Sequence, residues 1–345
     1  NVQAKGDNQT HEGQTGGTYI DKWADGVQAD NGSKVTVDGN VTSEKGRAID
    51  SHGSEVTVNG NVHSEKESAI NARDGSTITI DGSVSSNVGI SLGGIIETTD
   101  STIKITKDVK AKNAWGILAG PGTDIEVGGN VSSEKEAVYI SGKDALIVVD
   151  GNVYSTKGCA MDILEQAEAT VKGDVTGNKL AIWMDNCSKL QSLGKISSND
   201  VGILLSLYDA QGTGELDLGT IDAQTAISIN YGEYKDIDKI LAALPEMTVY
   251  KMNADTLLRL YTGSEGLGSK EVSDLAEKIL MEKLQYAIRK QDTSNGKINI
   301  AGELTKAKEG QTLTFSVVAN DGYEVDSVSA GDEIIPVIKK DNGTY

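Results

Sequence analysis

The sequence predicts a mainly β protein built around a right-handed parallel β-helix of about ten turns, spanning residues 18–231. A five-residue motif recurs seven times and is followed by two shortened copies, with starts 21 to 25 residues apart, which is the period of a solenoid. Short alternating runs of β-branched residues flank each copy, and forty glycines against three prolines supply tight turns. Ten turns stacked about 4.8 Å apart would give a rod roughly 45–50 Å long.

The motif reads Val-Asp-Gly-Asn-Val in its fullest form, at residues 37–41 and 149–153. Equivalent residues of stacked turns form columns, so the fourth motif position is expected to form a ladder that hydrogen-bonds backbone groups at a tight turn. The glycine before it is expected to supply a positive φ. Acids in this column are separated by other residues, which disfavours calcium binding and favours a structural role. The ladder comprises Asn40, Asn61, Asn130 and Asn152, with Ser83, Asp108 and Asp174 in other turns.

Each repeat contains three short runs that are expected to be strands. In the first complete repeat they are residues 35–37, 41–43 and 48–51. Three strands in about 22 residues are typical of a parallel β-helix, whereas leucine-rich repeats need a Leu-x-x-Leu-x-Leu frame that this sequence lacks. One longer interval contains the apolar, glycine-rich residues 89–99, which are expected to form a packed bulge.

The segments outside the repeat differ from it in pattern. Residues 1–17 are polar and are expected to be a flexible N-terminal segment. Residues 232–290, where the period is lost, are predicted to be a helical cap or linker, because an open solenoid end exposes strand edges that need covering. Residues 291–345 alternate again and predict a small β domain.

Three helices are expected within the cap. The first covers residues 237–241 and ends before Pro245, and the second follows Asn253 as its N-cap. The third covers residues 270–290 and carries its apolar side chains on one face.

Composition excludes several classes of partner. A formal net charge of −19 disfavours nucleic acid and anionic membrane surfaces, because phosphate groups select for lysine and arginine. The sequence has no apolar run long enough for membrane insertion. Cys159 and Cys187 fall at different points of the turn, which makes a disulfide between them improbable, and Cys159 is interpreted as a small buried apolar residue. We expect neither a metal site nor a cofactor.

Catalysis was considered because parallel β-helices include polysaccharide lyases and glycoside hydrolases. These enzymes need a close pair of carboxylates, or a basic residue beside clustered acids, and no adjacent turns show such a cluster. Arginine is nearly absent from the repeat, and the histidines at 11, 52 and 63 have no Ser or Cys partner pattern. The sequence therefore favours a protein that is not an enzyme, with a lyase or hydrolase as the alternative.

One outward column is a candidate ligand-binding site. If Ile182 and Met184 point inward, Trp183 points outward, and the same register exposes its equivalents in neighbouring turns. An apolar strip about 20 Å long could stack on sugar rings or dock a protein. The preferred alternative is that the helix at 270–290 covers this strip. The column consists of Leu118, Tyr139, Asp162, Trp183 and Leu204.

The Gly-Asn-Val repeat resembles the adhesin-like, right-handed parallel β-helix proteins of bacterial surfaces, which have a pectate-lyase-like solenoid. Residues 310–345, with Gly-Tyr-Glu-Val at 322–325 and Asp-Asn-Gly-Thr-Tyr at 341–345, resemble the small β modules of bacterial cell-surface proteins. Such modules continue with another strand, so the chain is expected to stop inside or at the edge of a domain.

The resemblance implies a secreted or cell-surface protein whose rigid solenoid recognises a host or bacterial surface glycan or protein without catalysis. A structural stalk without any ligand is the remaining alternative.

Overall fold

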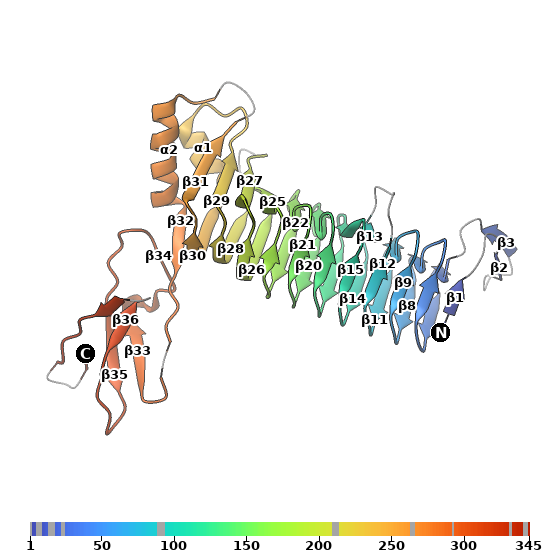
Figure 1. Cartoon of the computed structure of the whole chain (residues 1–345), viewed down its shortest axis with the longest axis horizontal. Coiled ribbons are helices and arrows are strands. Elements are labelled where there is room, and N and C mark those ends of the chain that lie inside the picture. Colours follow the sequence, from blue (N-terminus) through green and yellow to red (C-terminus); the bar gives the residue numbers. More distant parts are fainter. Residues whose placement is uncertain are drawn as a thin grey trace.

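The structure is a computed structural model that describes residues 2–4, 9–12, 18–21, 25–87, 94–208, 214–262, 266–291, 293–330, 333–340 and 344–345. These residues form a parallel β-solenoid of about nine turns, with two helices inserted near its C-terminal end and small antiparallel β pieces near the C-terminus. This confirms the predicted fold class. Figure 1 shows the turns stacked into a rod, with the helices and the antiparallel strands at its C-terminal end.

Each turn contributes one strand to each of three faces, because three short runs recur in every repeat. The first face contains β5 (Lys34–Val37), β8 (Glu55–Val58), β11 (Thr77–Ile80), β14 (Thr102–Ile105), β17 (Asp124–Val127), β20 (Leu146–Val149) and β23 (Glu168–Val171). The second face contains β6 (Val41–Ser43), β9 (Val62–Ser64), β12 (Val84–Ser86), β15 (Val109–Ala111), β18 (Val131–Ser133), β21 (Val153–Ser155) and β24 (Val175–Thr176).

The third face is one parallel sheet of eleven strands. These are β4 (Val27–Asp30), β7 (Ile49–His52), β10 (Ile70–Arg73), β13 (Gly94–Thr98), β16 (Trp115–Ala119), β19 (Val138–Ser141), β22 (Met161–Leu164), β25 (Leu180–Asp185), β27 (Val201–Ser206), β29 (Thr225–Asn230) and β31 (Thr256–Tyr261). Toward the C-terminus the first two faces merge into the longer strands β26 (Lys189–Ser197), β28 (Glu215–Asp222) and β30 (Glu246–Asn253).

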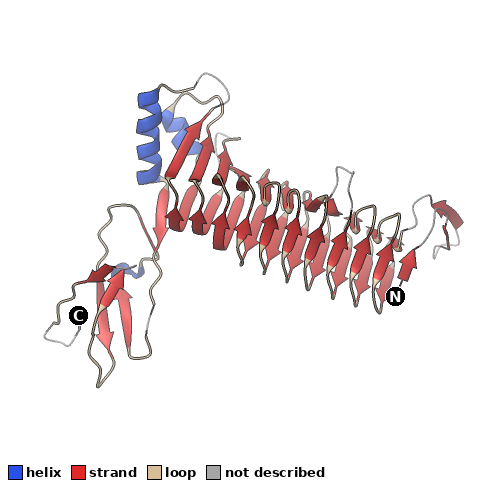
Figure 2. Cartoon of the chain, viewed as in Figure 1, coloured by secondary structure: helices blue, strands red, loops and turns tan. Residues whose placement is uncertain are grey.

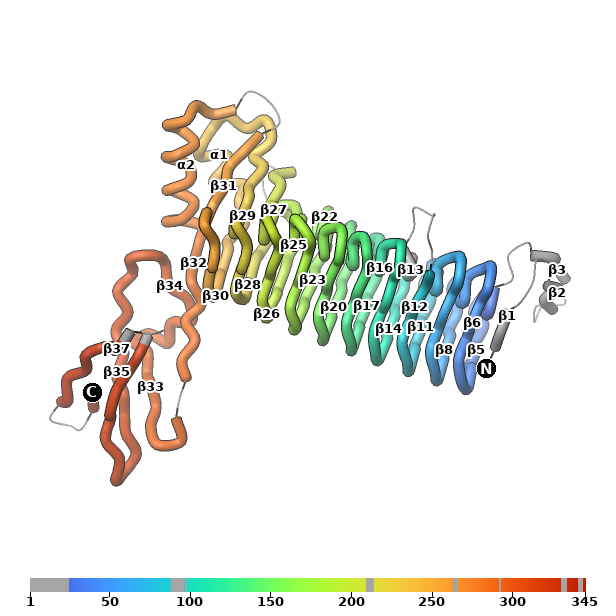
Figure 3. Tube along the Cα trace, in the orientation of Figure 1, coloured from blue at the N-terminus to red at the C-terminus, as the bar shows by residue number. Residues whose placement is uncertain are grey.

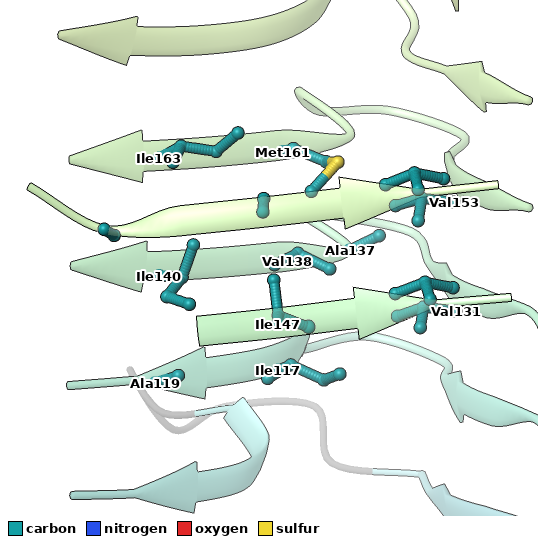
Figure 4. Packing of buried hydrophobic residues seen from close by; sticks show 14 of the residues in the cluster. Ile117, Ala119, Val131, Ala137, Val138, Ile140, Ile147, Val153, Met161 and Ile163 are labelled. Atoms are coloured by element: carbon teal, nitrogen blue, oxygen red, sulfur yellow. The ribbon is translucent and has the colours of Figure 1, made fainter. Parts of the chain in front are cut away.

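Aliphatic columns fill the interior of the solenoid. On the third face Ile117, Val138 and Met161 lie in register on consecutive strands, and all three are fully buried. Figure 4 shows them facing Val131 and Val153 of the second face. Because one face of each strand is buried, a register slip of one residue would expose this column, so the core fixes the register of the whole stack.

The corner between the first and second faces carries the Asn ladder. The Oδ1 atom of Asn40 accepts the backbone N–H of Asn61 at 2.8 Å. Asn130 and Asn152 repeat the contact, each Oδ1 accepting the N–H of the next turn at 2.9 and 2.8 Å. The side chains therefore join consecutive turns through backbone amides.

The glycine column beside this ladder has a different cause from the one expected. Among the described motif glycines only Gly39 has a positive φ, of 134°. The others are required by close stacking: a Cβ on Gly151 would lie 2.5 Å from the carbonyl oxygen of Gly129. Positive φ values instead gather where the third face returns to the first, as at Asn31, Asp74 and Gly75.

Replacing Asn152 by alanine is expected to lower the free energy of unfolding by about 1 kcal/mol, because the Asp174 N–H loses its acceptor in an exposed ladder. Urea unfolding monitored by circular dichroism measures the change. Asn59→Ala is the matched control, since its amide bonds only the Asp38 side chain at the same corner, and its effect should stay within about 0.5 kcal/mol. Equal effects of the two substitutions would contradict the ladder.

A second column, of buried serines, closes the corner between the second and third faces. Ser64 Oγ donates to the Gly46 carbonyl at 2.9 Å and accepts the Glu67 N–H at 3.2 Å. The sequence prediction treats the third residue of each second-face strand only as part of an alternating run. The serine that recurs at this position indicates the column. The column consists of Ser43, Ser64, Ser86, Ser133 and Ser155.

The N-terminal segment contains strands where a flexible segment was expected. The first strand, β1 (Val2–Ala4), pairs in parallel with β6 at the end of the second face. The next two, β2 (Gln9–Glu12) and β3 (Thr18–Asp21), form an antiparallel pair. The third face begins at β4, after this pair.

Parallel stacking continues beyond Tyr231, where the period of the sequence is lost. Strand β31 pairs with β29, and β32 (Leu284–Ala287) pairs with β30. The helix expected after Asn253 is therefore wrong: Leu258 and Leu260 alternate with period two and stack on Ile227 and Ile229. Figure 3 follows the chain through these last turns.

The two helices lie at the C-terminal end of the solenoid. The first, α1 (Ile237–Ala243), begins after Asp236, whose carboxylate accepts the N–H groups of Asp238 and Lys239. The second, α2 (Ser269–Glu282), ends well before residue 290 and buries Leu275 and Ile279. It packs against α1, β31 and β32.

The described residues after 295 include short antiparallel strand pairs (Figure 2). The strand β34 (Lys306–Ala307) pairs with β32, and a 3₁₀ turn covers Ala301–Glu303. Two hairpin-like pairs follow: β33 (Gly296–Ile300) with β35 (Phe315–Ala319), and β36 (Val328–Ala330) with β37 (Glu333–Ile335). Residues 89–93 of the expected bulge lie outside the described part of the chain, and its remainder includes β13.

Candidate functional site

The structure brings the five candidate ligand-binding residues into one outward column. Leu118 is in register with Tyr139, Tyr139 with Asp162, Asp162 with Trp183, and Trp183 with Leu204. The residues come from β16, β19, β22, β25 and β27, so consecutive members lie about 4.8 Å apart.

The helix that was expected to cover this column lies elsewhere. Because β30, β31 and β32 extend the solenoid, α2 packs beside β31, three strands away from Trp183. Trp183 keeps 36% of its surface exposed, and Leu118, Tyr139 and Leu204 are half-buried. The preferred interpretation, in which α2 covers the column, is therefore wrong.

A shallow depression of about 360 Å³ borders the column on its N-terminal side. Leu118 and Tyr139 line it, and the Trp115 ring stacks on Tyr139 with centroids 5.5 Å apart and planes 15° from parallel. Trp115 was missed because it stands three residues before Leu118, outside the expected column. The remaining lining residues are Asn71, Ala72, Arg73, Thr98, Thr99, Ala119, Gly120, Pro121 and Ser141.

Asp162 is the one charged residue among the five candidate residues. Only 7% of it is exposed, and its Oδ1 atom has no hydrogen-bond partner among the described residues. Burial raises the pKa of this carboxyl to about 6; a hydrogen bond with Cys159 acts in the opposite direction, and the Glu136 carboxylate adds to the rise. Burial also raises the pKa of the Cys159 thiol, which donates to the Met161 and Ala181 carbonyls.

The N-terminal part of the same column is polar but internally paired. Asp50 is as buried as Asp162, yet it accepts from the Asn71 amide at 2.6 Å and pairs with Arg47 at 3.2 Å. Beside it, Arg73 Nε donates to the His52 ring at 2.7 Å. The early arginines, Asp50 and His52 therefore form a hydrogen-bonded polar network, in contrast to Asp162 Oδ1.

Comparison of the chain with protein-family models, with curated proteins and with solved structures gives no match. The functional proposal therefore rests on the residues of the three faces.

The second face holds a row that sequence reasoning missed. Ser85 Oγ lies 2.9 Å from His63 Nδ1, and His63 Nε2 lies 3.0 Å from Glu65 Oε1. The Asn87 amide and His63 lower the pKa of the Glu65 carboxyl by hydrogen bonding. The row combines residues of two turns, so no motif within a short stretch of sequence predicts it. A serine, a histidine and a carboxylate in a row are the residue types used in acyl transfer, but that reaction also needs backbone N–H groups to stabilise an oxyanion. The N–H groups of β9 and β12 are instead engaged in the parallel sheet.

No group of three or more His, Cys, Asp or Glu side chains within the described ranges is placed to hold a metal ion. Neither described helix has the length and apolar character needed to cross a bilayer. Cys159 and Cys187 are not joined by a disulfide.

Proposed function

We propose that this chain is a non-catalytic, secreted or cell-surface recognition protein that binds a host or bacterial surface glycan along the third face of its solenoid. The observation that carries the proposal is the stacked Trp115–Tyr139 pair beside a depression of about 360 Å³, with Trp183 exposed on the same face.

Aromatic rings held on a sheet suit sugar binding. The apolar faces of a pyranose ring stack on planar side chains, and the polar groups of a binding site then fix its orientation. Here the rings stand on strands of a rigid stack, so little ordering of the protein is needed on binding. A protein ligand on this face is the alternative, because Tyr and Trp also concentrate at protein interfaces.

Tyr139→Ala and Trp183→Ala are each expected to weaken binding of a recognised oligosaccharide about tenfold, which corresponds to about 1.4 kcal/mol. A panel of immobilised glycans identifies the oligosaccharide, and titration calorimetry measures the dissociation constants. Tyr154→Ala is the matched control, because this tyrosine is 40% exposed but stands on the second face. Unchanged glycan and cell binding in every variant would support a stalk without a ligand.

Glycoside hydrolysis is a second candidate, favoured by one observation. Asp162 is a buried carboxyl whose pKa is raised to about 6, and the Glu136 carboxylate contributes to that rise. Glycosidases use two carboxyl groups, of which the proton donor has a raised pKa. If the protein hydrolyses glycans, incubation with a polysaccharide should release reducing ends, and Asp162→Asn should abolish this release. If the protein only binds glycans, neither the native protein nor the variant should release reducing ends.

A further inference from the structure

We infer that Asp162 and the aromatic rings beside it form a subsite for the ammonium group of an amino sugar. This inference rests on the proposed glycan recognition and names the class of glycan. It starts from Asp162 Oδ1, which is buried without a hydrogen-bond partner among the described residues. The carboxyl takes part in a hydrogen bond with Cys159, but a buried oxygen left unsatisfied is costly, and a positively charged donor is the group that best satisfies it.

The surroundings of Asp162 favour a cation. Glu136, before β19, is a second carboxylate whose charge acts on Asp162, and Cys159, before β22, contributes a thiol that stays protonated because burial raises its pKa. On the flanking strands the column neighbours are Tyr139 and Trp183. Two carboxylates and a neutral thiol leave net negative charge at this point of the face.

The neighbouring rings add a second attraction. Tyr139 and Trp183 stand on either side of Asp162 along the column, each about 4.8 Å away, and an ammonium group is attracted to an aromatic face within about 6 Å of its centroid. A sugar whose ring stacks on Tyr139 or Trp183 can therefore direct an amino substituent toward Asp162. The net charge of −19 also attracts cationic ligands over longer distances.

Trp183 reports on a sugar that reaches this part of the face. Its indole is 36% exposed and donates from Nε1 to Ser206 Oγ at 3.1 Å. Oδ1 of Asp162 is covered in the structure, so the side chains around it must shift when the ammonium group enters, and a sugar ring that stacks on Trp183 changes the surroundings of the indole. Binding is therefore expected to change tryptophan fluorescence.

The test compares the hexamer of glucosamine with the hexamer of N-acetylglucosamine at pH 7, by calorimetry and by tryptophan fluorescence. The two probes differ in the charge of the amino group. Native protein is expected to bind the glucosamine hexamer at least about tenfold more tightly. Asp162→Asn should remove this preference, whereas Asp50→Asn should keep it, because Asp50 is a column carboxylate of equal burial that is already paired.

A pH series separates this subsite from general attraction to an acidic protein. Lowering the pH from 7 to 5 neutralises Asp162, whose pKa is about 6, while the amines of the glucosamine hexamer become more fully protonated. The preference for the glucosamine hexamer should fall about tenfold over this interval in native protein despite the added ligand charge, and it should not fall in Asp162→Asn.

Two results would overturn the inference in distinguishable ways. Equal affinity for both hexamers, with binding still lost in Trp183→Ala, would leave glycan recognition standing and remove the ammonium subsite. If neither hexamer binds, the subsite is also overturned. The rest of the glycan panel then tests the proposed function separately, because binding of any other glycan would support it.

Discussion

Gly151→Ala is expected to destabilise the solenoid by about 3 kcal/mol, the upper part of the range for overpacked sites. The new Cβ would lie 2.5 Å from the Gly129 carbonyl oxygen and 2.6 Å from its carbon. Both atoms belong to backbone that the Asn ladder and the strands hold in place, so no flexible side chain can yield. Gly173 stacks on Gly151 in the same way, so the strain falls inside a continuous column. Urea unfolding measures the loss.

Gly75 provides the matched control, because it needs glycine for a different reason. Its φ is +81°, and no described atom lies within 4 Å of the position its Cβ would take. Gly75→Ala should cost about 1 kcal/mol through backbone strain, and Gly75→Asn should recover most of it because Asn tolerates the left-handed region. At Gly151, Asn should be no better than Ala. Native-like unfolding of Gly151→Ala would contradict the stacking explanation.

The repeat alone predicts the solenoid and the register of its faces. A constant period places equivalent residues on consecutive turns, so the alignment of Leu118, Tyr139, Asp162, Trp183 and Leu204 follows from counting. In the structure each of these residues is in register with the next. Alternation separates inward from outward positions for the same reason.

Other features depend on distances that the sequence does not encode. A glycine required by a close approach looks the same in a sequence as one required by a positive φ, so Gly60 and Gly151 were assigned the wrong cause. The Trp115–Tyr139 stack joins different repeat positions of neighbouring turns, so the period does not predict it. The Ser85–His63 contact joins equivalent positions one period apart, but a histidine occupies that position in only one of the second-face strands, so no recurring residue type indicates it.

The position of α2 differs from the predicted one for a related reason. Loss of the 22-residue period after Tyr231 predicts that stacking ends there, whereas β28, β30 and β32 continue it across inserted helices. The alternating leucines of β31 carried the relevant signal. Once the solenoid is longer, the helix lies beside its last strands, and the column around Trp183 keeps an open surface.

Asp162→Asn is expected to become more stable relative to native protein as the pH rises. Folding raises the pKa of Asp162 from its ordinary value of 3.8 to about 6, so the folded state binds the proton more tightly than the unfolded state. The resulting stabilisation is complete below pH 3.8 and is lost as the pH rises through 6. This interval corresponds to about 3 kcal/mol, by which the variant should gain on native protein between pH 3.5 and pH 7.5.

Urea unfolding of both proteins across this pH range measures the gain, with Asp50→Asn as the control that removes a paired carboxylate from the same column. A difference that stays constant with pH would show that Asp162 is not held in an unfavourable charged state. If the gain appears, native protein keeps at neutral pH a carboxylate that reduces its stability, as is common at functional sites. The same substitution should then stabilise the solenoid and abolish its preference for an amino sugar, a combination that a purely structural role for Asp162 does not produce.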